Sequence, residues 1–324
     1  MRDATARLQD AERRLFARYA IDVESHHVAL ADPALGVRVL EAGKGDPVVL
    51  VHGSGMLAST WAPLVARLRD RRTLAVDLPG FGLSDRFDYQ GRPLREHAVA
   101  QLTSLLDSLG IREACLVGTS LGGMWALAMA HQRPDRVSGV VSLGVPAVAL
   151  PGMHGDPFFT LATTPVVGAL GVRLRPPTVN LARRAMVDVL GEHAIRQMPD
   201  DWFEVVLAGM RMPGYARAMR SHLMLAMRRG RPRPENHFTD AELGRFNPRV
   251  LFVWGESDVY GPPGIGHRAA ARMPRARVAT MPGNHAPFLD DPAHCAELVT
   301  AFFPASAGVT AAEAAASPPV RAAG

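Results

Sequence analysis

A serine flanked by glycines, set between a strand-like and a helix-like run, constrains the fold of this chain more than any other feature. The pentapeptide at 118–122 reads G-T-S-L-G, with an apolar run at 114–117 before it and a helix-like run at 124–131 after it. Strand, tight turn and helix are the setting in which a G-x-S-x-G turn lifts a serine hydroxyl clear of the backbone. Glycine suits such a turn because it tolerates strained dihedral angles and lets other backbone approach closely. The pattern predicts Ser120 as a nucleophile, the alternative being an ordinary glycine–serine turn.

Strand-like and helix-like segments alternate on both sides of this turn. Continuous apolar runs, typical of strands buried on both faces of a parallel sheet, occur at 47–51, 73–76, 114–117, 137–143, 250–254 and 277–281. Helical spacing is found at 61–68, 96–109, 124–131 and 293–303. Residues 26–43 instead alternate like a pair of strands with a turn at Asp32-Pro33. This order predicts an α/β fold with a doubly wound, mostly parallel sheet.

The alternation stops between residues 146 and 246, where no strand is convincing and several stretches have helical spacing. We therefore expect a core made of residues 26–145 and 247–304, with residues 146–246 inserted between two of its strands as a helical lid. Residues 1–25 are expected to form an N-terminal helical extension. Residues 305–324 are rich in Ala, Pro and Gly and are expected to be a disordered tail.

Composition excludes several classes of partner. The chain has 324 residues, of which 48% are hydrophobic, so it can build a large core. It has no uninterrupted apolar run long enough for a transmembrane helix and no apolar segment of a secretory signal near its N-terminus. We therefore expect a cytoplasmic protein with no membrane partner.

The cysteines and the basic residues argue against a disulfide, a metal site and a nucleic-acid partner. Cys115 and Cys295 are the two cysteines, and no CxxC or Cys/His cluster surrounds them, so neither a disulfide nor a metal site is expected. The net charge of +5 comes mainly from arginine, since Lys44 is the only lysine. A nucleic-acid partner is not expected, because no clustered basic face on a recognisable module is evident.

Ser120 needs a base to act as a nucleophile, and the base needs a carboxylate to orient it. Ligands of open parallel sheets bind beyond the carboxyl ends of the strands, so the candidates are loops that follow later strands. Asp258 and His285 follow the last two predicted strands. The order Ser, Asp, His is the one that this sheet topology uses. Glu256 is a competing acid, and Asp258 is favoured because it lies deeper in its loop.

An oxyanion hole requires backbone N–H groups aimed at the developing negative charge. Leu121, directly after the serine, is expected to supply one of them. The loop after the first parallel strand reads H-G-S-G, and we expect the second N–H from Ser54, with Gly55 as the alternative. A plain glycine turn is the competing interpretation of this loop. Gly53, Gly55 and Trp125 are expected to contact the substrate.

Together these motifs resemble the α/β-hydrolase fold superfamily, in its branch with a serine nucleophile and an inserted lid. The matching pieces are H-G-S-G at 52–55, D-L-P-G-F-G-L-S at 77–84, G-T-S-L-G-G at 118–123, W-G-E-S-D at 254–258 and G-N-H at 283–285. The resemblance implies structural roles for Asp77 and Asp85. Serine at position 120, where relatives resembling dehalogenases and epoxide hydrolases use aspartate, implies attack on a carbonyl group.

The predicted lid is expected to set the specificity. It holds most of the methionines, which suit a large apolar pocket, although each of them is equally well explained by helix packing. It also holds seven arginines with no Asp or Glu between Val205 and Pro234: Arg211, Arg217, Arg220, Arg228, Arg229, Arg231 and Arg233. Such a stretch can meet a carboxylate-bearing substrate or an acidic carrier protein, or it can be a solvated face.

The leading interpretation is a cofactor-free serine hydrolase that cleaves an ester, lactone, thioester or activated carbon–carbon bond in a medium-sized, largely apolar small molecule. In it Ser120 attacks, His285 transfers the proton and Asp258 orients the imidazole. The first alternative is a non-hydrolytic cyclase or lyase of secondary metabolism that uses His285 as its base. The second is a ligand-binding receptor, which the complete set of three residues disfavours. A monomer and a homodimer are both compatible with the sequence.

Overall fold

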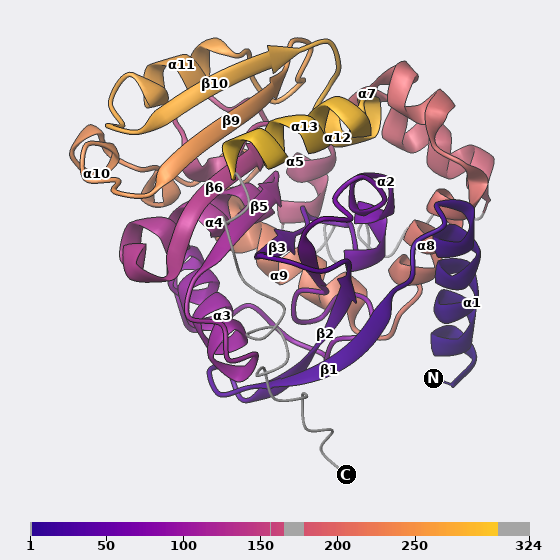
Figure 1. Cartoon of the computed structure of the whole chain (residues 1–324). Helices are drawn as coiled ribbons and strands as arrows, with labels where there is room; N and C mark the ends of the chain where they lie inside the picture. The colour runs from indigo at the N-terminus through magenta and orange to yellow at the C-terminus, as the bar shows by residue number, and fades with distance from the viewer. Residues whose placement is uncertain (1, 156, 165–177, 304–324) are drawn as a thin grey trace.

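The computed structural model describes residues 2–155, 157–164 and 178–303. Within these residues the main sheet has eight strands in the order β1-β2-β4-β3-β5-β6-β9-β10 (Figure 1). Their bounds are β1 Glu24–Leu30, β2 Leu35–Ala42, β3 Pro47–Val51, β4 Arg72–Val76, β5 Ala114–Thr119, β6 Val137–Leu143, β9 Arg249–Gly255 and β10 Ala276–Met281. β2 runs antiparallel to both neighbours, and the strands from β4 to β10 are parallel to one another. This confirms the predicted mostly parallel sheet, including the strand pair that turns at Asp32-Pro33.

Helices cover both faces of the parallel part, so its central strands β3 and β5 are buried along almost their whole length rather than on alternate residues. The helices of the core are α2 Ala62–Val65, α3 Leu94–Ser108, α4 Leu121–Gln132, α11 Gly264–Ala270, α12 Pro287–Asp290 and α13 Pro292–Phe302. α3 packs against α4, and α2 packs against α12 and α13 (Figure 1). The parallel strands therefore bring their carboxyl ends to one edge between two layers of helices.

One predicted helix is shorter than expected. The spacing at 61–68 predicted a continuous helix, but only α2 is α-helical there, after a 3₁₀ turn at Ala58–Trp61. Beyond α2 the chain tightens, because the amides of Arg67 and Leu68 each bond to a carbonyl three residues back. Side-chain spacing distinguishes such tightened turns poorly from an α-helix.

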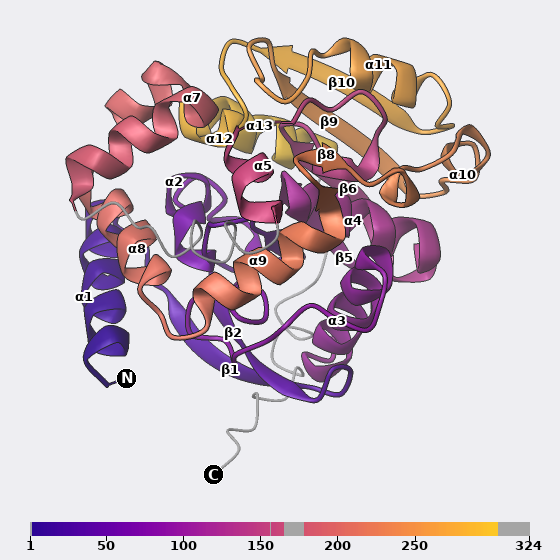
Figure 2. The same cartoon turned by 180° about the vertical axis from the view of Figure 1, so that it is seen from behind.

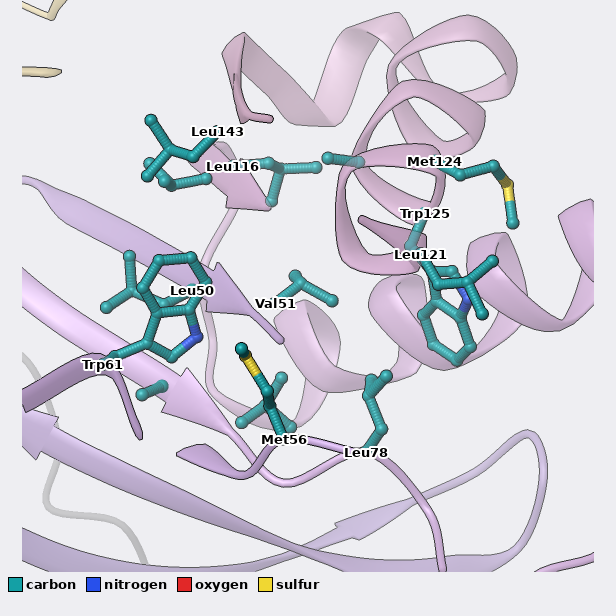
Figure 3. Close-up of a cluster of buried hydrophobic side chains, with 14 of the residues drawn as sticks. Leu50, Val51, Met56, Trp61, Leu78, Leu116, Leu121, Met124, Trp125 and Leu143 are labelled. Carbon is teal, nitrogen blue, oxygen red and sulfur yellow. The ribbon is translucent and has the colours of Figure 1, made fainter. Parts of the chain in front are cut away.

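The part of the core below the Ser120 turn lies between β3, β5 and β6 and the first turns of α4. Figure 3 draws Leu50 and Leu116 from the central strands and Leu121 and Met124 from α4 as members of one hydrophobic cluster, and all four side chains are buried. Burying a large apolar side chain stabilises a fold by about 1.5–3 kcal/mol. This packing makes a rigid floor beneath the carboxyl ends of β3 and β5.

The segment between β6 and β9 is largely helical in the described residues and crosses the front of the molecule in Figure 2. Its elements are α5 Pro157–Thr163, α7 Val179–Gln197, α8 Asp200–Met210, α9 Tyr215–Ala226, β7 Met227–Arg228, β8 Arg231–Pro232 and α10 Asp240–Leu243. The expectation of no strand is wrong at the β7–β8 hairpin, where Arg229 and Gly230 both take positive φ and close a two-residue turn. We refer to this segment as the insertion.

The N-terminal helix α1, Arg2–Arg18, stands beside α8 of the insertion in both views (Figures 1 and 2). The expected extension ends earlier than residue 25, because β1 begins at Glu24. The predicted tail at 305–324 lies outside the described residues. None of the helices in the described ranges combines the length and apolar character that crossing a bilayer requires.

A buried ion cluster joins α1 to the core. Both guanidinium arms of Arg38 on β2 bond to the Glu12 carboxylate, at 2.6 and 2.7 Å, and its Nε bonds to Asp77 Oδ2 at 2.7 Å. Asp77 also accepts the backbone amides of Ala58 and Leu83. Asp77 thus fixes the turns after β4 from inside the protein, which is a structural role.

Candidate active site

The turn after β5 holds Ser120 in a strained conformation. Its φ and ψ are 53° and −123°, a region that non-glycine residues seldom occupy. A Cβ on Gly122 would lie 2.0 Å from the Val51 carbonyl oxygen, and one on Gly118 would lie 2.3 Å from the Gly122 carbonyl oxygen. Only glycine fits at either position, so the turn fixes Ser120 at the carboxyl edge of the sheet.

The loop after β3 lies directly against this serine. A Cβ on Gly53 would lie 2.9 Å from the Ser120 Cβ, and Gly55 has a positive φ of 81°. Leu121 is the first residue of α4, a position whose N–H has no acceptor within its own helix. The loop that carries Ser54 and the start of α4 therefore flank Ser120, as an oxyanion hole requires.

His52, at the start of this loop, is a structural residue. Its Nδ1 donates to the Gly53 carbonyl at 2.8 Å, and its Nε2 accepts the Leu78 amide at 3.0 Å. Burial lowers the pKa of the His52 imidazole, which keeps the ring neutral for this pair of bonds. The ring thereby joins the loops that follow β3 and β4.

Asp258 and His285 meet beyond the ends of β9 and β10. His285 Nδ1 lies 3.0 Å from Asp258 Oδ2 and 3.1 Å from Oδ1, and both side chains are buried. The carboxylate also accepts the amides of Val145 and Tyr260, each at 3.0 Å. Glu256, the competing acid, is exposed. The structure thus pairs His285 with the preferred acid and holds that acid with backbone donors.

The other ring nitrogen of His285, Nε2, takes no part in the pair with Asp258. Nε2 is buried and has no hydrogen-bond partner among the described residues, Ser120 included. The Tyr260 ring packs edge-on against the imidazole with centroids 4.4 Å apart. In the neutral imidazole whose Nδ1 proton the carboxylate accepts, Nε2 carries the lone pair. Bonds between a catalytic nucleophile and its base are often long without substrate, so an unpartnered Nε2 is compatible with a base.

Sequence reasoning missed Asn284, which joins the loops of the acid and the base. Its Oδ1 accepts the amides of His285, at 2.9 Å, and Val259, at 3.3 Å. Asp290 Oδ2 in turn accepts the Asn284 amide at 2.9 Å. Burial raises the pKa of the Asp290 carboxyl group. The sequence held one signal for this role: asparagine side chains in turns often bond to nearby backbone groups.

Helix α9 of the insertion lies against the site and covers Trp125, which was expected to contact the substrate. The indole of Trp125 is fully buried, and its Nε1 donates to His222 Nε2 at 3.2 Å. A Cβ on Gly55 would lie 3.3 Å from the Tyr215 hydroxyl and 3.6 Å from the Met219 methyl group. The prediction that Trp125 contacts substrate is not supported, because α9 covers it. Tyr215 and Met219, rather than Trp125, approach the loop beside Ser120.

Comparison with known proteins agrees with this architecture. Residues 48–298 match the model of the Alpha/beta hydrolase family. The chain belongs to this family. A 2-hydroxy-6-oxononadienedioate/2-hydroxy-6-oxononatrienedioate hydrolase from Cupriavidus pinatubonensis is 30% identical over 264 residues, 76% of this chain and 83% of the relative. The enzyme of that name from Paraburkholderia xenovorans is 32% identical over 249 residues, 74% of this chain and 80% of the relative.

Solved structures share the fold of this family member at lower identity. A carboxylesterase from Bacillus subtilis superposes with a TM-score of 0.72 at 20% identity and covers 93% of this chain and 99% of its own. A meta-cleavage product hydrolase from Pseudomonas fluorescens gives a TM-score of 0.67 at 20% identity, covering 86% and 97%. The relatives named in both comparisons are hydrolases, so this member of the family is an enzyme.

Proposed function

We propose that this protein is a serine hydrolase in which Ser120 is the nucleophile, His285 the base and Asp258 the residue that orients the base. The observation that carries the proposal is the buried His285–Asp258 pair, with an unpartnered Nε2, at the sheet edge where the strained turn holds Ser120. The two catalytic loops follow neighbouring parallel strands, so their relative position depends on a rigid sheet.

The reaction begins when Ser120 Oγ attacks a carbonyl carbon and passes its proton to His285 Nε2. The carbonyl oxygen becomes an oxyanion, held by the Leu121 amide and by that of Ser54 or Gly55. The tetrahedral intermediate collapses, the leaving group takes the proton from His285, and an acyl group stays on Ser120. Water, deprotonated by His285, then releases the acid and restores the serine.

The insertion acts as the lid of this site in our proposal. Support comes from α9, whose Tyr215 and Met219 lie over the Gly55 loop. Another contact comes from α7, where Gly191 takes a φ of 82° and a Cβ there would lie 3.1 Å from Asn284 Cβ. The insertion therefore touches both the oxyanion loop and the loop of the base, from which it can shape the substrate pocket.

We favour a 2-hydroxy-6-oxo-dienoate as the substrate class, with cleavage of the carbon–carbon bond beside the ketone. Two relatives at 30% and 32% identity carry names of this type. A carboxylic ester is the second candidate, supported by the shared fold of the Bacillus subtilis carboxylesterase. Both reactions pass through an oxyanion at a carbonyl group, so the same residues serve either.

Kinetics on the two substrate classes test the proposal. The purified full-length protein is assayed with 2-hydroxy-6-oxo-dienoates and with p-nitrophenyl esters, and is labelled with a fluorophosphonate. We expect turnover of at least one class and labelling of Ser120, and a fall in kcat of about 10⁴-fold or more in Ser120→Ala. Ser138→Ala, at an exposed position on β6, is the matched control and should behave like the wild type.

Isotope-labelled water separates hydrolysis from the cyclase or lyase alternative. Hydrolysis places one oxygen from water in the acid product, whereas cyclisation or elimination places none. Activity that survives in Ser120→Ala would overturn the assignment of the nucleophile. A second outcome would overturn hydrolysis: the fluorophosphonate labels Ser120, and a substrate is turned over, but no oxygen from water enters the product. His285 would then be the base of a different reaction.

A further inference from the structure

We propose that a groove on the outer face of α9 binds a small molecule in which a carboxylate or phosphate group is joined to a short apolar chain. The groove has a volume of about 880 Å³ and runs between α9, the chain just before it and the loop at 88–91. Volumes of roughly 300–1,000 Å³ are typical of small-molecule sites. The proposal does not depend on the chemistry assigned to Ser120.

The groove is separate from the candidate active site because α9 lies between them. Tyr215, Met219 and His222 recur at helical spacing on the buried face of α9, toward Gly55 and Trp125. Positions 217, 220, 221 and 224 form the opposite face of the helix and line the groove. One helix thus presents one face to each site.

The groove gathers positive charge. Four of the seven arginines of the 205–234 stretch line it, namely Arg211, Arg217, Arg220 and Arg233. Asp88 is the one carboxylate among the described lining residues, and Arg217 Nε already bonds to it at 2.5 Å. Arg233 pairs with Glu235 at 3.1 Å. The lining therefore carries an excess of guanidinium groups.

Arg220 lines the groove with its side chain half-buried and has an unused donor beside it. Its Nε is buried and has no hydrogen-bond partner among the described residues. A buried donor without an acceptor is unfavourable, so Arg220 gains from a partner that its Nε reaches by a small movement of the side chain. Guanidinium groups bind carboxylate and phosphate oxygens with paired, charge-assisted hydrogen bonds. An oxyanion is the partner that Arg220 fits.

The walls of the groove are held in place before any ligand binds. The Tyr89 amide donates to Ser221 Oγ at 3.0 Å, and Ser221 Oγ donates to the Ala218 carbonyl at 3.2 Å. Together with the Arg217–Asp88 pair, these bonds tie the loop at 88–91 to α9. Binding to such a preformed groove loses little conformational freedom.

The rest of the lining explains the apolar chain of the proposed ligand. Met212, Met224 and Leu225 lie beside the arginines, and methionine adapts to ligands of varied shape. An acidic carrier protein would be expected to cover about 800 Å² of a broader surface. A concave groove of this size fits a small amphiphilic anion better, so we assign it to a small molecule.

Calorimetric titrations of the full-length protein with octyl phosphate, octanoate and octanol test the assignment. Both anions should bind at least about tenfold more tightly than octanol, and Arg220→Gln should weaken them at least about tenfold. Arg220→Lys, which keeps the charge and loses the Nε donor, should lie between. Arg228→Gln, on the exposed hairpin outside the groove, is the matched control and should bind like the wild type.

Two more titrations distinguish a free anion from a lipid headgroup and from an acidic protein partner. Phosphatidylglycerol vesicles test a lipid headgroup, and a free acyl carrier protein tests an acidic protein partner. Ser120→Ala should bind octyl phosphate as tightly as the wild type, so failure of the proposed catalytic function leaves this result unchanged. Equal binding of octanol and octyl phosphate, undiminished binding in a folded Arg220→Gln, or binding of the carrier protein without binding of either anion would overturn the proposal.

Discussion

Asn284 joins the loops that carry Asp258 and His285 through a single side-chain oxygen. That oxygen accepts one amide from each loop, so it sets the distance between the acid and the base. Because its side chain acts on the backbone of these two loops, Asn284 is a positioning residue. Small displacements of a base matter because proton transfer depends steeply on geometry.

We therefore expect Asn284→Ala to lower kcat by about 10–100-fold with little change in KM. Asn284→Asp keeps an oxygen acceptor at the same place and should restore most of kcat. Steady-state kinetics on the best substrate, with circular dichroism to check folding, measures both effects. A kcat within twofold of the wild type in Asn284→Ala would show that the base is positioned by other contacts.

The structure agrees with several predictions about single residues, and it adds contacts that the sequence did not indicate. The glycines of 118–122 follow from the sharp turn, since the Val51 carbonyl crowds Gly122 and the Gly122 carbonyl crowds Gly118. Asp258 faces His285, whereas Glu256 points to solvent. The amides of Val145 and Tyr260 were invisible in the sequence, because backbone donors have no residue signature.

At the level of elements, α1 is attached to the core by a buried carboxylate. The Glu12 side chain is 5% exposed and that of its partner Arg38 is 4% exposed, so both charges have left water. Removing one member of a buried ion pair leaves the other charge without compensation. α1 also bonds to α8 through Arg18 and Asp201 at 2.6 Å, so the helix connects the core to the insertion.

Glu12→Ala should therefore lower the free energy of unfolding by about 3 kcal/mol, which is large for a position on a terminal helix. Asp10→Ala removes an exposed ion pair from the same helix and should cost at most about 1 kcal/mol. Urea denaturation of the two variants and the wild type measures the difference. Equal, small losses in both variants would mean that Arg38 is adequately paired by Asp77 alone.

The arginines of the 205–234 stretch lie on different elements, which the sequence alone does not reveal. Arg228 and Arg231 lie on the β7–β8 hairpin, whereas Arg217 and Arg220 share the outer face of α9. From the sequence, three roles for these arginines remained possible: binding a carboxylate-bearing substrate, binding an acidic carrier protein, or forming a solvated face. The groove proposal follows from Arg217 and Arg220 on α9, together with Arg211 before this helix and Arg233 after the hairpin.

At the level of the whole molecule, His222 links acid stability to the contact between the insertion and the core. Its ring stacks on Tyr89 with centroids 4.4 Å apart, and its Nε2 accepts the Trp125 indole proton. Burial is the main reason that the pKa of His222 is lowered to about 3. An unfolded chain binds this proton near pH 6.5. The contribution of neutral His222 is therefore complete above about pH 6.5 and is lost as the pH falls toward 3.

Between these limits the free energy of unfolding should fall by about 1.4 kcal/mol per pH unit for this one group. His222→Gln keeps an acceptor for Trp125 and removes the titration, so its stability should depend less steeply on pH. Urea denaturation of both proteins from pH 7 to pH 4 measures the two slopes. Equal slopes would show that other groups account for the acid sensitivity.

The sequence by itself determined the class of sheet, the strand order along the chain and the three residues that carry the proposed chemistry. It did so because buried parallel strands are continuously apolar, and because a strained turn admits only glycine beside the nucleophile. Only the tertiary structure decided what α9 covers, that Trp125 is a core residue, and that four arginines share one groove. These are contacts between segments far apart in the chain, and they depend on how helices pack rather than on any local pattern.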